Sequence, residues 1–505
     1  MPLTPVIPRH PLRWHDSIEA IRTTARTANT GQGVYIVGGA VRDAYLHLTP
    51  HDLDLATSGD GCPLARHIAD KFDGAFYPLD RERGVGRALI PWGDIQLTVD
   101  VAQFRGPDLL TDLQKRDFTV NAMAVSLTGD LQTVIDPLRG LSDLDARVLR
   151  QCSPDSIPSD PVRLLRAVRT SITYDLRIEP ETHRTLRNVA PRLADVSPER
   201  TRDELIQILA GKRPAAALKV LHQLALLDPM LPEVEALIGI IQGPPHRFNV
   251  WQHTLLTVEF LDTILRIIAP TRSDNLTASA QTGLIAFTLD RFRPSLQRHL
   301  QHTWPNERPH RALLLLAALL HDSGKPATRS VDDNGSIRFF GHETTGETLA
   351  HSRAAELRLS NDETSRLATI VRHHMRPHWL HANRSLTPRA IYRFWRDTGP
   401  AGVDICLLAM ADYLATVGPT LDPQRWHEYL KTIETLLDRY YLHHDTAVAP
   451  SPVITGQQLL DTFNLQPGPQ IGRLLELVRE AQAAGEVATQ QEALDWVQRF
   501  LEHDE

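Results

Sequence analysis

Two aspartates, Asp52 and Asp54, stand one residue apart in the segment GGAVRDAYLHLTPHDLDLA. The alternating pattern DLDLA predicts a strand, and alternate side chains of a strand share one face, so both carboxylates lie on the same side. Two such carboxylates repel each other unless a cation lies between them, and an all-oxygen ligand set suits Mg²⁺ completed by substrate phosphates. A metal held there can activate an attacking hydroxyl and stabilise a leaving pyrophosphate. The alternative is a solvated acidic edge.

The same segment begins with a glycine pair, Gly38 and Gly39, between an apolar run (VYIV) and a helical pattern (AVRDAYLHL). Glycines admit close backbone approach, and N–H groups at a turn and a helix start bind phosphate oxygens. Arg42, in the first turn of that helix, can add a charge-assisted contact. Each feature alone fits an ordinary strand–turn–helix unit. Together with the aspartate pair they predict a nucleotidyl-transfer site.

Further motifs follow in a fixed order: KRDFTVNAMA (115–124), DPLRGLSDL (136–144), SDPVRLLRAVRT (159–170) and SPERTRDEL (197–205). With GGxVRD and DxD, they resemble the motifs of the class II tRNA nucleotidyltransferases, the family of bacterial CCA-adding enzymes and poly(A) polymerases. Two positions depart from the family pattern. Ser159 replaces a glutamate, which leaves open how firmly Arg163 is held, and Arg139-Gly140 replaces a glycine pair.

The resemblance implies roles for the matching positions. Asp52 and Asp54 are the catalytic Mg²⁺ ligands, and the nucleotide is bound by Gly38, Gly39, Arg42, Arg116, Asp117, Asp160, Arg163, Arg166 and Arg169. Asp160 offers acceptors and Arg163 donors, so one helical turn can present a pairing edge to C or A.

From the residues alone, other readings of these positions stay open. Asp160 also fits a helix cap before Pro161. Three-residue steps drift around a helix, so Arg169 faces nearly opposite Asp160 and also fits a solvated arginine. Asp100, in the strand-like segment TVDVA, is either a third carboxylate at the metal or a buried structural aspartate.

A second group of candidate ligands lies in the other half of the chain. Histidine and carboxylate ligands suit transition metals better than Mg²⁺. The order of these residues resembles that of the HD metal-dependent phosphohydrolase superfamily, which implies the ligands His253, His321, Asp322, His342, His373 and Asp412. His374 is either a ligand or a donor to one, and Lys325 is placed to meet a phosphate. The alternative is a set of surface histidines among the 23 of the chain, but their apolar helices would make unpaired histidines costly.

Composition narrows the class of protein. The net charge of −7 requires that any nucleic-acid surface be a local patch, and the arginine-rich region 160–213 is our candidate for binding a tRNA acceptor end. Three cysteines without a CxxC pair argue against a disulfide scaffold and fit a cytoplasmic location. The apolar run 312–320 is too short to span a bilayer, so we expect no membrane segment. The oligomeric state stays open.

Strand-like runs occur from Gly33 to Leu149, and helical patterns dominate beyond Pro158. We predict an α+β protein, with a small nucleotidyltransferase head built on a mixed sheet of the polymerase-β type and an elongated all-α body that includes an HD domain. The expected segments are an N-terminal extension (1–30), the head (31–155), a helical neck and body for base recognition and RNA binding (156–243), the HD domain (244–425) and a helical tail (426–505).

The resemblance implies template-independent addition of CCA to tRNA 3′ ends from CTP and ATP. The reaction is Mg²⁺-dependent in-line attack of the 3′-hydroxyl on the α-phosphorus, with release of pyrophosphate. The HD domain can add a phosphohydrolase activity with transition metals. Within the same fold, the alternatives are a poly(A) polymerase or an enzyme that adds only CC or only A. In a different class, the HD domain is the enzyme and the head only binds nucleotide or RNA.

Overall fold

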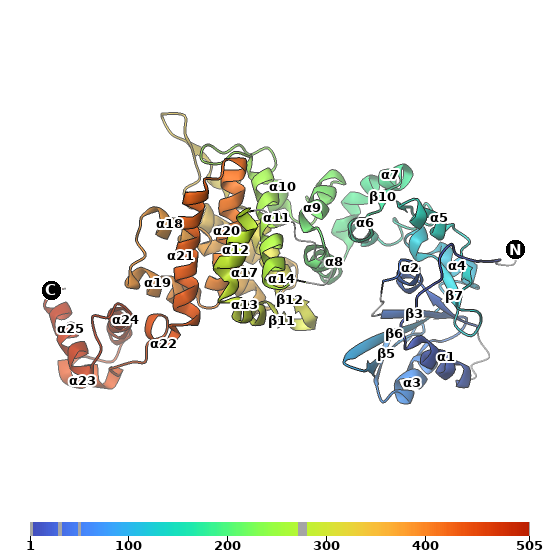
Figure 1. Cartoon of the computed structure of the whole chain (residues 1–505), viewed down its shortest axis with the longest axis horizontal. Coiled ribbons are helices and arrows are strands. Elements are labelled where there is room, and N and C mark those ends of the chain that lie inside the picture. Colours follow the sequence, from blue (N-terminus) through green and yellow to red (C-terminus); the bar gives the residue numbers. More distant parts are fainter. Residues whose placement is uncertain (1–3, 29–32, 49–51, 271–279, 504–505) are drawn as a thin grey trace. The chain divides into compact units, whose positions relative to one another are not determined.

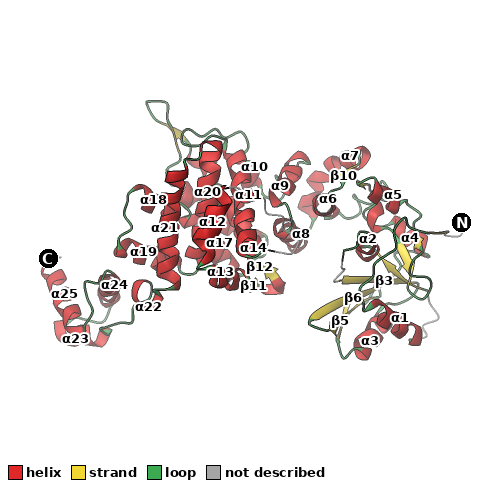
Figure 2. Cartoon of the chain, in the orientation of Figure 1, coloured by secondary structure: helices red, strands yellow, loops and turns green. Residues whose placement is uncertain are grey.

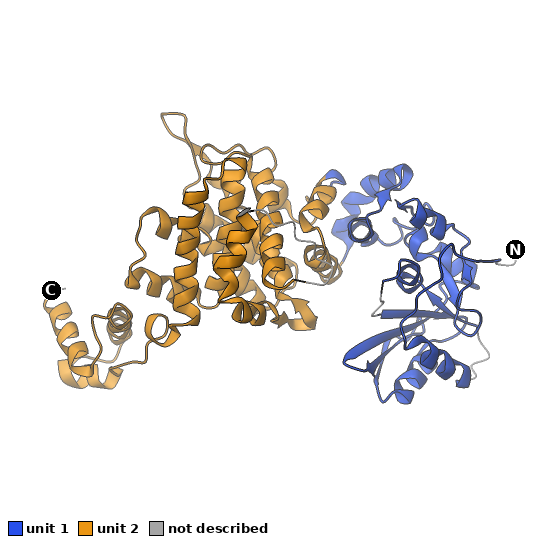
Figure 3. Ribbon diagram, in the orientation of Figure 1, with its two compact units in different colours: residues 1–196, 223–226 blue, residues 197–222, 227–505 orange. Residues whose placement is uncertain are grey.

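The computed structural model describes residues 4–28, 33–48, 52–270 and 280–503, and its chain forms two compact units. Unit 1 contains residues 1–196 and 223–226, and unit 2 contains residues 197–222 and 227–505 (Figure 3). The strands of the first unit and the helices of the second give the α+β organisation expected from the sequence (Figure 2).

Unit 1 is built on an eight-stranded sheet of order β1-β8-β7-β2-β3-β6-β5-β4. The sheet is mixed, because β3 and β6 are parallel whereas the other neighbours are antiparallel. Burial alternates along β5 and β6, as expected for strands with one face against a core. The strands are β1 (Pro5–Val6), β2 (Val34–Val37), β3 (Asp52–Thr57), β4 (Ala75–Asp80), β5 (Val85–Trp92), β6 (Ile95–Gln103), β7 (Ala124–Ser126) and β8 (Val134–Ile135).

Helices α2 and α3 pack against this sheet, and two further short strands, β9 (Val148–Leu149) and β10 (Arg177–Ile178), pair in parallel. α1 buries Ile18, Ile21 and Ala25, the spacing of an amphipathic helix. The helices of unit 1 are α1 (Ile18–Thr27), α2 (Gly39–Tyr45), α3 (Cys62–Lys71), α4 (Leu109–Gln114), the 3₁₀ turn η1 (Thr119–Asn121), α5 (Gly140–Asp145), α6 (Arg163–Tyr174), α7 (Pro180–Val189) and η2 (Ala190–Asp195). α6 and α7 therefore belong to the same compact unit as the sheet.

Unit 2 is almost entirely helical (Figure 1). Its core helices are α8 (Pro198–Ala210), α9 (Pro214–Gln223), α10 (Pro232–Glu235), α11 (Val250–Ile268), α12 (Ala280–Asp290), α13 (Arg293–Leu300), α14 (His310–Leu320), α15 (Lys325–Thr328), α16 (His342–Glu356), α17 (Asn361–His373), α18 (Arg376–Ala382), α19 (Pro388–Thr398), α20 (Ala401–Val417) and α21 (Pro423–Tyr441). Segment 401–420 has the length and hydropathy of a membrane span, but 78% of it is buried inside the fold. It is therefore a core helix of unit 2.

The end of the chain forms a core of its own. α22 (His444–Ala447) leads to α23 (Gly456–Phe463), α24 (Pro469–Ala483) and α25 (Gln490–His503), which enclose Leu459, Leu474 and Val478. α24 also packs against α19, where Glu480 accepts hydrogen bonds of 2.9 and 2.6 Å from Arg393.

Candidate active site and a second metal-ligand cluster

The glycine turn lies directly against the aspartate pair. Gly38, between β2 and α2, has φ of +75° and ψ of −140°, a conformation that essentially only glycine adopts. A Cβ atom there would lie 3.0 Å from Asp54 Oδ2 and 3.0 Å from Arg116 Nη1. The turn therefore brings backbone, a carboxylate and a guanidinium together at one point.

Three carboxylates gather on β3 and β6. Along β3, Leu53 and Leu55 are buried, whereas Asp52 is exposed and Asp54 is partly buried. The parallel pairing of β3 with β6 places Asp54 opposite Asp100. Burial raises the pKa of Asp54; the charge of Arg116 opposes this rise, and those of Asp100 and Asp52 add to it. A divalent cation would offset this repulsion, and the all-oxygen donor set of Asp52 and Asp54 fits Mg²⁺.

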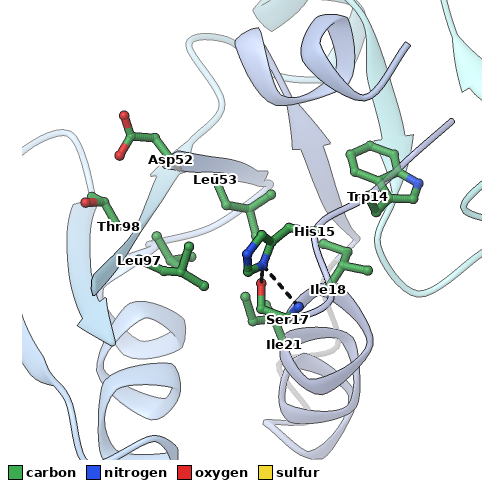
Figure 4. Close-up of a pocket in the computed structure, with 10 residues that line it drawn as sticks. Trp14, His15, Ser17, Ile18, Ile21, Asp52, Leu53, Leu97 and Thr98 are labelled. Atoms are coloured by element: carbon green, nitrogen blue, oxygen red, sulfur yellow. Dashed lines mark hydrogen bonds between the residues drawn. The ribbon is translucent and has the colours of Figure 1, made fainter. Parts of the chain in front are cut away.

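The opposite side of β3 is apolar. Leu53 and Leu97 point toward Ile18 and Ile21 of α1, with Asp52 at the rim of the pocket that they line (Figure 4). This pocket has a volume of about 20 Å³, which holds at most one water molecule. The substrate face of the strand is therefore the side on which Asp54 meets Gly38.

Asp100 is already paired in this structure. Arg87 donates two hydrogen bonds of 2.8 Å, from Nε and Nη2, to the two oxygens of Asp100. Asp100 is not fully buried, because 27% of its side chain is exposed, and a metal-binding role for it stays a prediction.

Arg42 lies beside the turn but has protein partners. A Cβ at Gly39 would lie 3.1 Å from its Nη2, and its guanidinium carbon lies 3.9 Å from the centre of the Tyr174 ring. It donates to Asp43 at 2.9 Å, and also to Asn121 Oδ1 and the Tyr174 hydroxyl. With 8% of its surface exposed, Arg42 ties α2 to η1 and to the end of α6.

The next motif connects the glycine turn to α6, the helix predicted to read the base. Arg116 donates from Nε and Nη2 to Asp112 Oδ2, at 3.1 and 3.0 Å. Asp117, predicted to bind nucleotide, is 5% exposed and accepts hydrogen bonds from Arg166, Asn121 and the Phe118 N–H. Burial raises the pKa of Asp117, but the Arg166 charge and these hydrogen bonds outweigh burial and bring it to about 2. Asp117 therefore anchors Arg166 and with it α6.

Two backbone carbonyls hold Arg163. Its Nη1 donates to Ser156 O at 2.7 Å and its Nη2 to Lys115 O at 3.1 Å, while Nε lies 3.9 Å from Asp160 Oδ2. These bonds fix Arg163 without the family's glutamate at position 159. The Asp160 carbonyl accepts the Arg163 N–H at 3.0 Å, so Asp160 stands at the turn that leads into α6.

The charge of Arg169 acts on Tyr174, at the end of α6. Burial raises the pKa of Tyr174 to about 12, and the charges of Arg42 and Arg169 oppose this rise. Tyr174 is the residue of α6 that contacts Arg42.

The DPLRGLSDL motif is explained by its backbone. Asp136 accepts hydrogen bonds from the N–H groups of Gly140 (2.6 Å) and Leu141 (2.9 Å) at the start of α5. A Cβ at Gly140 would lie 2.3 Å from Thr119 O, so this glycine is required for close approach. Arg139 adopts a left-handed conformation with φ of +62°, where the family pattern has glycine.

In unit 2, the second set of predicted ligands converges on Asp322. His321 Nε2 lies 3.3 Å and His253 Nε2 lies 3.6 Å from Asp322 Oδ2. On the other oxygen, Oδ1, His342 Nε2 lies at 3.6 Å and His374 Nε2 at 4.0 Å. Two ligands bound at about 2.1 Å with a tetrahedral angle are about 3.4 Å apart. These residues form two groups that share Asp322 and have the spacing of metal ligands. The first group is His253, His321 and Asp322, and the second is Asp322, His342 and His374.

The chemistry of these atoms also fits metal ions. Asp322 Oδ1 is buried and has no hydrogen-bond partner among the residues that the structure describes. Asp412 lies against the first group, with Oδ1 2.9 Å from His253 Nε2. Burial raises the pKa of Asp322, but the charges of His321 and Lys325 hold it well below its usual range, so the carboxylate is ionised.

The prediction of His373 as a ligand is wrong in this structure. His374 lies in the cluster, whereas His373 lies near Arg376 and Asp397, and burial lowers its pKa to about 4. Consecutive side chains on a helix point about 100° apart, so only one of the two histidines can face Asp322.

Two histidines beside the cluster, His378 and His246, are not predicted from the sequence, and Lys325 contacts protein groups. His378 Nε2 lies 2.9 Å from Asp412 Oδ2 and its Nδ1 3.1 Å from the Tyr429 hydroxyl, whereas the ring of His246 lies 5.2 Å from that of His253. The segments PHWLH and PPHRF carry no metal-site pattern that would have revealed them. Lys325 Nζ lies 2.7 Å from Asp322 and donates to Gln242 at 2.8 Å.

A third polar group, around Asp404, is a hydrogen-bonded network. His299 and His310 place Nε2 at 2.7 and 2.9 Å from Asp404 Oδ1, which are hydrogen-bond lengths. Arg366 donates to Oδ2 at 2.6 Å, so an arginine supplies the cation that Asp404 needs.

Comparisons with known proteins identify the family of each part of the chain. Family models match as the poly A polymerase head domain (residues 34–150), the probable RNA and SrmB-binding site of polymerase A (175–238), the HD domain (250–417) and a putative tRNA nucleotidyltransferase domain 2 (427–497).

Relatives span nearly the whole chain. The A-adding tRNA nucleotidyltransferase of Deinococcus radiodurans is 34% identical over 477 residues, covering 93% of this chain and 96% of the relative. The CC-adding tRNA nucleotidyltransferase of Thermus thermophilus is 31% identical, covering 92% and 93%. Solved CCA-adding enzymes share the fold at 19% identity: one in complex with ATP has a TM-score of 0.62 (97% and 100% covered), and the Thermotoga maritima enzyme complexed with tRNA has 0.57 (97% and 97%). The chain therefore belongs to the class II tRNA nucleotidyltransferase and poly(A) polymerase family, that of the CCA-adding enzymes.

Proposed function

We propose that this chain adds CCA to tRNA 3′ ends from CTP and ATP and releases pyrophosphate. The observation that carries this proposal is that Asp54 and Arg116 meet at the Gly38 turn. Asp54 Oδ2 and Arg116 Nη1 each lie 3.0 Å from the position that a Cβ atom at Gly38 would occupy. A metal-binding carboxylate, backbone N–H groups and a guanidinium are the groups that a nucleoside triphosphate requires. Solved enzymes of this fold in complex with CTP and with ATP support the choice of substrates.

Asp52 and Asp54 would hold the Mg²⁺, which when bound supplies charge neutralisation for the attacking hydroxyl and the leaving pyrophosphate. The Gly38–Gly39 turn and Arg116 bind the triphosphate and orient it toward Asp54. Arg42 contributes positive charge beside Gly39 while its own contacts keep α2 and α6 in register. The chain thus contributes orientation and electrostatic stabilisation, the main requirements of phosphoryl transfer.

The base is read by groups that the fold holds still. Arg163 is fixed by the carbonyls of Ser156 and Lys115, with Asp160 beside it, and Arg166 is fixed by Asp117. Such fixed donors and acceptors can take the place of a template base, because they present one pairing edge to the incoming nucleotide.

A second candidate is addition of only one nucleotide type. The A-adding and CC-adding relatives cover more than nine-tenths of both chains, which favours a specialised enzyme. The residues of the site are compatible with both candidates, so the products must decide.

We further propose that the Asp322 cluster binds two transition-metal ions and hydrolyses phosphate esters. This rests on the two ligand groups that share Asp322. His253, His321, Asp322 and Asp412 would hold one ion, and Asp322, His342 and His374 the other. Lys325 is buried and is held by the same carboxylate and by Gln242, so it would have to leave these partners to meet a phosphate.

The test is extension of tRNA transcripts that end before the CCA, after C and after CC. Purified protein with Mg²⁺ receives CTP, ATP or both, beside the variant Asp52→Ala/Asp54→Ala. Stepwise addition of CC and then A, lost in the variant, supports the first proposal. Addition of only A or only CC supports the second candidate, and no extension of any transcript refutes both. Hydrolysis of p-nitrophenyl phosphate and of a 2′,3′-cyclic nucleotide with Mn²⁺, lost in Asp322→Ala, tests the cluster separately.

A further inference from the structure

One row of side chains crosses the sheet from the active site to its edge. Strand pairing places Asp54 of β3 opposite Asp100 of β6, Asp100 opposite Arg87 of β5, and Arg87 opposite Tyr77 of β4. Directly opposite residues share one face of a sheet. We call Arg87 and Tyr77 the outer pair.

The outer pair faces away from α3. The neighbouring position Gly86 faces α3, because a Cβ there would lie 2.9 Å from the Ala65 methyl and 3.0 Å from the Phe76 ring. Successive side chains of a strand point to opposite faces, so Arg87 and Tyr77 lie on the face of Asp54. Tyr77 is 51% exposed and 39% of the Arg87 side chain is exposed.

The guanidinium of Arg87 has donors to spare. Nε and Nη2 bind Asp100, whereas Nη1 makes no hydrogen bond to the residues that the structure describes. The charges of Asp52 and Asp54 act on Arg87 as well as that of Asp100, so the guanidinium lies close to the catalytic carboxylates. The outer pair thus offers a cation and an exposed aromatic ring in line with Asp54.

In-line transfer fixes the side from which the second substrate arrives. The attacking and leaving oxygens lie on opposite sides of the transferred phosphorus. The groups assigned to the triphosphate, the Gly38 turn and Arg116, lie at β2 and beyond, on one side of β3. The attacking 3′-hydroxyl must therefore approach from the other side, where β6, β5 and β4 follow in order. With about 4.8 Å between strands, Arg87 and Tyr77 stand about 10 and 14 Å from β3.

We propose that Arg87 and Tyr77 bind the single-stranded 3′ end of the tRNA: Arg87 binds a phosphate and Tyr77 stacks on a base. This inference rests on the proposed function and names the residues that position the attacking hydroxyl. Guanidinium–phosphate pairing and base stacking on aromatic rings are the usual means of holding single-stranded RNA. Asp100, bound to Arg87 and opposite Asp54, connects this subsite to the metal ligands.

The test compares Tyr77→Ala, Tyr77→Phe and Arg87→Ala with Arg66→Ala, whose guanidinium covers Phe76 on the opposite face. The substrate is the transcript that the wild-type protein extends, and KM is measured for tRNA and for the nucleotide. Tyr77→Ala should raise the KM for tRNA about 5-fold or more, as expected from loss of one stacked base, and leave the KM for nucleotide unchanged. Tyr77→Phe and Arg66→Ala should behave as wild type.

Arg87 is tested by salt dependence. The plot of log affinity for tRNA against log salt should become shallower by about 0.7 in Arg87→Ala, the amount for one phosphate contact in a single strand. If Arg87 only neutralises Asp100, the double variant Arg87→Ala/Asp100→Asn will bind tRNA as Asp100→Asn does, which overturns the proposal. If Arg87 contacts the tRNA, the double variant stays weaker. Normal extension kinetics in both Tyr77→Ala and Arg87→Ala also overturn it, whereas a wild-type protein that extends no tRNA instead refutes the proposed function.

Discussion

Two adjacent histidines with opposite placements provide a sharp test of the metal cluster in unit 2. His374 belongs to the group with Asp322 and His342, whereas His373, its neighbour along the chain, lies outside the cluster. We therefore expect His374→Gln to lose one of two bound ions and His373→Gln to keep both. Because the two substitutions are chemically identical, they serve as each other's control.

The size of the effect follows from mass action. At a free metal concentration 100 times Kd, each bound ion stabilises the folded protein by about 2.7 kcal/mol. For a unit of this size, 1 kcal/mol corresponds to a change in Tm of about 2–4 °C. Loss of one ion should therefore reduce the metal-induced rise in Tm of unit 2 by about 5–10 °C. The rise is taken within each variant, so that any destabilisation by the substitution itself cancels.

The assay uses the full chain stripped of metal and then titrated with Mn²⁺ or Co²⁺. Bound metal is counted by elemental analysis, and Tm is followed by calorimetry with and without the ion. The assignment is refuted if His374→Gln retains two ions and the full metal-induced rise in Tm, or if His373→Gln loses an ion.

Three other predictions concern the fold. Arg139→Gly should raise the free energy of unfolding by about 0.5–1 kcal/mol, because it removes a side chain from a left-handed backbone position. Gly140→Ala should lower the free energy of unfolding by about 1–3 kcal/mol, because the new methyl group would collide with Thr119 O. Urea denaturation measures both changes, and equal effects of the two substitutions would contradict the reasoning. The pKa of Asp117 falls from 3.8 in the unfolded chain to about 2 in the folded one, so this group contributes about 2 kcal/mol above pH 4 that is lost as the pH falls to 2; calorimetry of wild type and Asp117→Asn across that range should show a shallower acid limb in the variant. Glu480→Gln removes the charge of a carboxylate that is 3% exposed and paired with Arg393. It should lower the stability of α23–α25 by about 1.5–3 kcal/mol, which faster proteolysis before Pro452 would show. Glu486→Gln, at an exposed ion pair, should change this stability little.

Local sequence signals are strongest where spacing and backbone needs coincide. The DLDLA alternation predicts that Asp52 and Asp54 share a face, and Gly38 occupies a conformation that its residue type anticipates. The arrangement of strands is different, because strand order depends on contacts distant in sequence. No local pattern indicates that β6 inserts between β3 and β5, and this insertion is what sets Asp100 beside Asp54.

The cluster at Asp322 shows the same division. The sequence predicts the types and the order of the ligands. The choice between His373 and His374 depends on the rotation of α17 about its axis, and this rotation is determined by packing. The place of His378 beside the cluster cannot be predicted from local sequence, because its partner Asp412 lies 34 residues away along the chain. The motif predicts that Asp117 binds the nucleotide, whereas its burial and its bond to Arg166 give it an anchoring position that depends on tertiary contacts.

The two sites of this chain differ in donor chemistry, and this separates their metals. Asp52 and Asp54 offer only oxygen, which suits Mg²⁺, whereas the Asp322 groups combine imidazole nitrogen with carboxylate, which suits transition metals. Free Mg²⁺ in excess will therefore fill the first site without filling the second, and a transition metal at low concentration will fill the second first. The two proposed activities should therefore respond to different metal ions in one preparation, and this allows a test of whether the hydrolysis proposed for unit 2 acts on the RNA ends that unit 1 is proposed to extend.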